Sequence, residues 1–268
     1  MNTTMGVIVN SHTVRIERLL PGPIDRVWEY FSKPEYVSFW LMECTLEPKL
    51  QGLISLKSEP IPEGTIANNQ VEPQVTIIRG LIREFDPPRL IACSWYQHSY
   101  GVATNLRVEL EQRDDQVLVV LTHSHLDPEF MAAVAAGWHT NFETLIALIR
   151  GEEKPELDPI FKELLEEYRV LVAAAGIVMV AGTATAAMAE ARSDNPYKVV
   201  SAQKQQLLKK YDSIWKDADR ISNDITLLER ASERDNKSLD VLYRDLKEKK
   251  DTLKNIELDV RDLDKVLI

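Results

Sequence analysis

The sequence predicts an α+β domain, in which a curved antiparallel sheet wraps one long helix, followed by an apolar helix and a C-terminal coiled coil. Segments of alternating apolar and polar residues recur between Thr13 and Ser124, apolar residues repeat at helical spacing from Phe130 to Gly151, and from Leu207 they step by four and three. A sheet with one apolar face needs a covering helix, and the long helix is the expected cover. We therefore expect three parts, at 12–152, 158–191 and 198–268.

The first elements are a strand and two short helices. Thr13–Leu20 alternates apolar and polar residues, as a half-buried strand does, and the prolines at 21 and 23 end it. Ile24–Phe31 then places its apolar residues on one helical face. Pro34–Leu41 predicts a second short helix that carries Phe39 and Trp40.

A run of strands and the long helix complete the domain. The strands are expected at Thr45–Glu47, Leu53–Ser58, Gln74–Phe85, Arg89–His98, Thr104–Glu111 and Val117–Ser124. Turn signals at 86–88 and 113–115 separate the last of them. The long helix ends at Gly151, which is suited to a left-handed cap, and Gly137 leaves a gap beside Trp138.

Charge and cysteine content exclude several functions. The chain has 268 residues and a net charge of −10. Of its 32 basic and 42 acidic residues, 16 basic and 15 acidic ones lie from Lys198 onward. Residues 1–197 therefore contain 16 basic and 27 acidic residues. Such an acidic front part argues against a nucleic-acid partner. Cys44 and Cys93 predict a reducing compartment and no disulfide framework. Met1–Ser11 lacks a signal-peptide pattern, so we expect the front domain to be cytoplasmic.

Several segments occur together in an order that resembles a known family. They are Thr13–Trp28, Pro34–Trp40, Asp86–Trp95, Leu121–Ser124 and Ala136–Trp138. As a set they resemble the START-like superfamily, in its branch related to the C-terminal domain of the activator of the heat-shock chaperone ATPase. The resemblance covers residues 12–152 and implies a helix-grip fold with an apolar cavity. Its members include lipid carriers, cyclases, hydrolases and co-chaperone domains, so it implies no single function.

Strand parity suggests which side chains line such a cavity. If Trp95 and Gln97 share one inward face and His123 another, they converge on the long helix, and the short helices add further aromatic residues. The candidate ligand-binding residues are Trp28, Phe31, Trp40, Trp95, Gln97, His123, Trp138 and Phe142. A filled core made of the same aromatics is the alternative, and a slip of one residue would exchange Trp95 for Tyr96.

We find no catalytic constellation and predict no cofactor and no metal. Nucleophile elbows, phosphate-binding glycine loops and zinc-protease motifs are absent from the sequence. His123 and His125, with His98 on another strand, have no third ligand fixed by spacing. A hydrogen-bonded or exposed histidine pair therefore fits better.

The uncharged segment Val170–Ala189 matches the thickness of a bilayer, at about 1.5 Å per helical residue over about 30 Å. We expect a single transmembrane helix. A buried Ala-rich helix in a soluble cytoplasmic oligomer, or an internal signal-like anchor, are the alternatives. Basic residues flank the segment about equally, so they do not orient it.

A C-terminal row of apolar residues at heptad spacing, called the seam below, predicts a coiled coil. Apolar residues recur at heptad spacing from Leu207 to Leu267, with polar positions at Ser232 and Asp235. The chain either folds back into a hairpin near 231–238 or continues as one helix, and the unbroken phase favours one helix. Its partner is a second copy or another chain.

Three functions are consistent with these patterns. The favoured one is a binding module for an apolar or amphipathic small molecule, tethered to a membrane and assembled by the coiled coil. The second is an enzyme of the cyclase or hydrolase type that uses His123 as acid and base, which requires titration near neutral pH. The third is a chaperone-associated interaction domain without a ligand.

Overall fold

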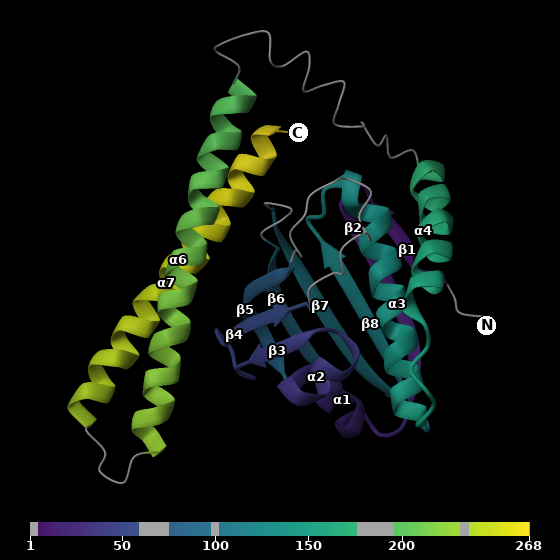
Figure 1. Cartoon of the computed structure of the whole chain (residues 1–268), viewed down its shortest axis with the longest axis horizontal. Coiled ribbons are helices and arrows are strands. Elements are labelled where there is room, and N and C mark those ends of the chain that lie inside the picture. The colour runs from purple at the N-terminus through teal and green to yellow at the C-terminus, as the bar shows by residue number, and fades with distance from the viewer. Residues whose placement is uncertain (1–4, 59–74, 98–101, 176–195, 231–235, 268) are drawn as a thin grey trace. The chain divides into compact units, whose positions relative to one another are not determined.

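The computed structural model describes residues 5–58, 75–97, 102–175, 196–230 and 236–267. The chain divides into two compact units, Met1–Ala184 and Thr185–Ile268. Each unit is described by itself below (Figure 1).

An eight-stranded antiparallel sheet forms the frame of the first unit. Its strands are β1 (Val7–Asn10), β2 (Thr13–Pro21), β3 (Glu43–Leu46), β4 (Leu53–Lys57), β5 (Ile77–Asp86), β6 (Leu90–Gln97), β7 (Val102–Arg113) and β8 (Gln116–Ser124). Their order across the sheet is β1-β2-β8-β7-β6-β5-β4-β3. Seven of the strands were predicted. β1 was not, because a four-residue edge strand with exposed Val7 and Val9 carries almost no burial pattern.

The helices follow the predicted order. They are α1 (Ile24–Ser32), α2 (Pro34–Trp40), the short 3₁₀ helix η1 (Pro128–Phe130), α3 (Met131–Arg150) and α4 (Leu157–Ala174). Gly151 caps α3 with a φ of 71°, the left-handed conformation expected there. α3 packs against β2, with α4 alongside it (Figure 1). The unit is thus an α+β domain whose curved sheet grips α3.

Strand register sets the side chains that face α3. Ile16 pairs with Leu121, Leu121 with Val108, and Val108 with Ile91, and all four are buried. The next row, two residues along, joins Val14, His123, Leu106 and Cys93. His123 is therefore a polar residue within an apolar row, on the predicted inward face of β8.

The structure describes only the first part of the predicted helix over 158–191. α4 closes at Ala174, and Val172 is fully buried in the core of the first unit, so the start of the predicted span belongs to a helix of the domain. Residues 176–189 of that span lie outside the described residues. Within the described part of the chain, no helix has the length and apolarity needed to cross a membrane. The apolar helix is not confirmed.

The second unit contains two long helices, so the expectation of one continuous helix is wrong. α6 (Pro196–Arg230) and α7 (Asn236–Leu267) pack against each other, and the pairs Tyr211–Glu257 and Asp217–Lys249 show that they run antiparallel. Of the fifteen predicted seam positions whose side chains the structure describes, nine are buried. Leu208 and Trp215 are buried where Leu207 and Ile214 were expected.

Candidate functional site: an aromatic cavity beside α3

A cavity of about 250 Å³ lies between the ends of β6–β8 and the first turns of α3. Its described lining is mostly apolar and combines the sheet, η1, α3 and α4. The lining residues are Leu41, Met42, Ile78, Trp95, Gln97, Thr104, His123, Leu126, Asp127, Phe130, Ala133, Val134, Gly137, Trp138, Asn141 and Phe161. Aromatic walls with a few polar groups are the usual composition of a small-molecule site.

The structure brings four of the eight candidate residues to this cavity: Trp95, Gln97, His123 and Trp138. The ring centroids of Trp95 and Trp138 are 5.3 Å apart, and each lies 6.0 Å from that of His123. The strand parity that put Trp95 rather than Tyr96 inward is the one observed.

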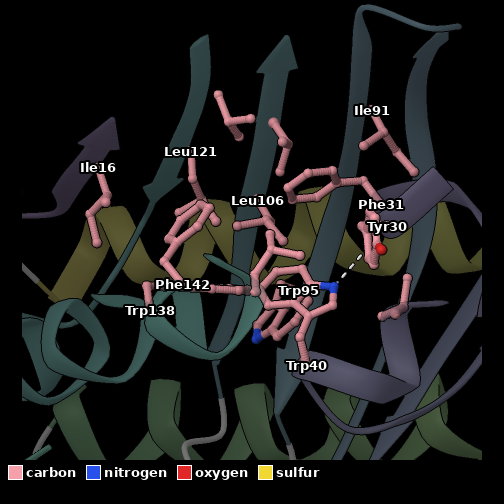
Figure 2. Close-up of a cluster of buried hydrophobic side chains, with 14 of the residues drawn as sticks. Ile16, Tyr30, Phe31, Trp40, Ile91, Trp95, Leu106, Leu121, Trp138 and Phe142 are labelled. Atoms are coloured by element: carbon pink, nitrogen blue, oxygen red, sulfur yellow. Dashed lines mark hydrogen bonds between the residues drawn. The ribbon is translucent and has the colours of Figure 1, made fainter. Parts of the chain in front are cut away.

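The other four candidates lie in the core. Phe31 and Trp40 line a smaller void of about 40 Å³, which Trp95 and Trp138 also border. Phe142 is fully buried and stacks on Trp40 at 5.9 Å, and Trp28 packs against Phe85 at 5.7 Å. Figure 2 shows Trp40, Trp95 and Phe142 converging in this cluster, with the hydrogen bond from the Trp40 indole to the Tyr30 carbonyl. Trp28 and Phe142 border neither space.

A chain of three hydrogen bonds sets the protonation state and the tautomer of the His123 ring. The indole N–H of Trp138 can only donate, and it lies 2.9 Å from His123 Nδ1, so Nδ1 carries no proton. The proton of the neutral ring is therefore on Nε2, which lies 2.7 Å from Thr104 Oγ1. The Thr104 hydroxyl in turn donates to the Trp95 carbonyl at 2.8 Å. Every polar atom of the ring is thus engaged.

Burial reinforces this neutral state. His123 is only 3% exposed, and burial lowers its pKa from 6.5 to about 3. A proton added at Nδ1 would face the indole N–H, which cannot accept it. The acid–base role for His123 required titration near neutral pH, and this environment opposes it.

Three further polar side chains reach the cavity: Gln97, Asn141 and Asp127. The side-chain amide of Asn141 forms no hydrogen bond to any described residue, so it is available to a ligand. Sequence reasoning missed Asn141, although it lies one helical turn after Gly137 on the same face of α3. It also missed Thr104, Asp127 and Phe161, which no local pattern singles out.

Gly137 keeps part of this space open. It lies within α3 and lines the cavity, and a Cβ built on it would meet nothing within 4 Å. Glycine inside a helix costs about 0.8–1.0 kcal/mol relative to alanine. The predicted gap beside Trp138 is therefore real.

α4 closes one side of the cavity and is anchored at a distance from it. Phe161 lines the cavity, while Tyr168 is fully buried and its hydroxyl accepts a hydrogen bond of 2.8 Å from the Gly6 N–H. His139 Nδ1 lies 3.2 Å from the same hydroxyl. His139 therefore faces α4 and is not part of the cavity lining.

The histidines do not form a metal site in the described residues, where no three potential ligands among His, Cys, Asp and Glu come together. His125 follows the end of β8 with a φ of 62° and is exposed, so it does not share the face of His123. His98 lies outside the described residues. Cys44 and Cys93 are both buried free thiols.

Comparison with known proteins supports the family resemblance of the N-terminal domain. Residues 21–150 match the family model described as "Activator of Hsp90 ATPase homolog 1-like protein". CalU16 from Micromonospora echinospora is 23% identical, with 60% of this chain and 88% of CalU16 covered, at a TM-score of 0.48. The BPP1335 protein from Bordetella parapertussis is 24% identical, with 63% and 94% covered, at a TM-score of 0.49. No curated protein sequence matches.

The family match spans the elements from the end of β2 to the end of α3, the part of the chain that carries β3–β8, the gripped helix and most of the cavity. α4 and the helices after it lie beyond the matched residues. The N-terminal domain of this chain therefore resembles the Activator of Hsp90 ATPase homolog 1-like family, as the sequence predicted.

Proposed function

We propose that the N-terminal domain binds a small, largely apolar molecule in the cavity beside α3. Burial of apolar surface against Trp95, Trp138 and Phe161 supplies the affinity, and the amide of Asn141 orients the ligand. The volume of about 250 Å³ falls below the range of about 300–1,000 Å³ of sites for drug-sized ligands, which favours a small one. An open cavity weighs against a domain that only docks on a chaperone.

The observation that carries the proposal is Gly137. A glycine in the middle of a helix weakens the helix, and a larger side chain would gain apolar contact if the space were core. Here the position borders the cavity with nothing within 4 Å of a built Cβ. A residue that keeps space open at a cost in helix stability supports an occupant for that space.

A titration of the full-length chain with a naphthyl alcohol tests the proposal. Binding is followed by calorimetry and by the indole N–H signals of the tryptophans in an NMR spectrum. Wild type and Gly137→Ala should bind, whereas Gly137→Leu should lose at least about tenfold in affinity because its side chain occupies the cavity. Leucine is a good helix former, so the fold is retained. Equal binding by Gly137→Leu and wild type would show that the ligand lies elsewhere.

We also propose, from the sequence, that the uncharged residues 176–189, which follow α4, attach the chain to a membrane and that the helical hairpin mediates self-association. The hairpin supports the second part with exposed apolar side chains at Leu227, Val241 and Leu258. Retention in the membrane pellet through a carbonate wash tests the attachment. Sedimentation of the detergent-solubilised chain tests the association, and a monomer at all concentrations excludes it.

A further inference from the structure

We infer that the cavity selects an organic amine, bound as its ammonium ion with the apolar part between the tryptophans and the charged end beside Asp127. This inference rests on the ligand-binding function proposed above and names the class of ligand.

The charges around the cavity carry the inference. Among the described lining residues, Asp127 is the one with a formal charge, and none is Lys or Arg. His123 is held neutral by its two hydrogen bonds. A carboxylate or phosphate ligand would lose hydration here without a cationic partner, which is unfavourable, whereas an ammonium ion meets a carboxylate.

The backbone holds Asp127 at the rim. Leu126 is buried, and its N–H donates to the His12 carbonyl at 3.0 Å, which fixes the chain just before Asp127. Asp127 is the N-cap of η1 and accepts from the Glu129 N–H through Oδ1 at 3.0 Å. A carboxylate has about four acceptor positions on two oxygens, so this cap leaves capacity for a ligand.

The aromatic walls of the cavity and the net negative charge of residues 1–197 also favour a cationic ligand. The faces of Trp95 and Trp138 carry the negative side of the ring quadrupole, which attracts a cation that passes them. Residues 1–197 contain 27 acidic and 16 basic groups. An acidic domain raises the local concentration of cations and lowers that of anions.

Three naphthyl probes that differ only in their polar group test the inference on the full-length chain at neutral pH and low salt. Each probe carries its polar group on a CH2 attached to the naphthalene ring, and the groups are a primary amine, which is an ammonium ion at neutral pH, an alcohol and a carboxylate. We expect the amine to bind about two- to fivefold more tightly than the alcohol, the size of effect expected for an exposed ion pair, and the carboxylate to bind most weakly. Added salt should reduce the amine's advantage.

Two matched variants locate the effect. Asp127→Asn keeps the oxygen that caps η1 but removes the charge, so the amine and the alcohol should bind equally. Glu129→Gln makes the same charge change two residues away, at an exposed side chain outside the cavity lining, and should retain the preference. Equal binding of amine and alcohol to wild type, or an amine preference that survives Asp127→Asn, would overturn the inference. Failure of all three probes to bind would refute the ligand-binding function itself.

Discussion

Replacing His123 with leucine should remove a large part of the acid sensitivity of the domain's folding stability. The folded state holds this imidazole neutral with a pKa of about 3, while the unfolded chain has the ordinary value of 6.5. Below pH 6.5 the unfolded state therefore binds a proton that the folded state does not. Stability that is fully present above pH 6.5 is lost as the pH falls toward about 3.

The magnitude follows from the distance between the assay pH and 6.5. Each pH unit in this window changes the free energy of unfolding by about 1.4 kcal/mol. Between pH 8 and pH 5 the contribution of His123 is therefore about 2 kcal/mol. The side chain is only 3% exposed, so screening by solvent does not reduce this value.

The assay is urea unfolding at pH 8 and at pH 5, followed by the near-ultraviolet circular dichroism of the buried tryptophans. His123→Leu is expected to be less stable at both pH values, because the Trp138 N–H loses its acceptor, at a cost of about 1–3 kcal/mol. The tested quantity is the change between the two pH values, which should be about 2 kcal/mol smaller in the variant. Carboxylates and His139 contribute equally to both proteins and cancel.

His125→Gln is the matched control, since His125 is exposed at the end of β8 and its replacement should leave the pH dependence as in wild type. If His123→Leu loses as much stability between pH 8 and pH 5 as wild type does, the imidazole is not held neutral by the fold. The hydrogen-bond order derived above would then be wrong, and an acid–base role for His123 would regain support.

Three further substitutions test other contacts. Thr104→Val should lower the free energy of unfolding by about 1–3 kcal/mol in urea, because it leaves the imidazole Nε2–H buried without its acceptor, whereas Thr104→Ser should retain most of the stability. Tyr168→Phe removes the acceptor of the Gly6 N–H, so that amide should exchange its hydrogen faster and stability should fall by about 1 kcal/mol; unchanged exchange would contradict the anchoring of α4. Tyr211→Phe removes a donor to the buried carboxylate of Glu257, and helix melting should then show the hairpin destabilised by about 1.5–3 kcal/mol, with no shift refuting the contact.

The elements that could be predicted from the sequence are those whose signal lies in their own residues. Alternation placed β2 and β8 with their inward faces, because successive side chains on a strand point to opposite sides. Helical spacing and the glycine at 151 determined α3 and its end. Parity and helix face together selected Trp95, Gln97, His123 and Trp138 for the cavity, since each depends only on a residue's own element.

Contacts between separate elements could not be predicted in this way, because they depend on which elements meet in the folded domain. Thr104 reaches His123 because of the register between β7 and β8, and the resulting bonds, not the residue type, hold the imidazole neutral. Phe161 lines the cavity because α4 folds back on α3.

The packing of the two C-terminal helices could not be predicted from the sequence for the same reason. An apolar seam at heptad spacing shows which face of a helix is buried but does not identify the helix that buries it. The seam is in phase on both sides of the break, so a hairpin and a single helix have the same pattern. Packing of α6 against α7 within one chain is a property of the three-dimensional structure, because the partner of a surface is set by topology and not by the surface's own period.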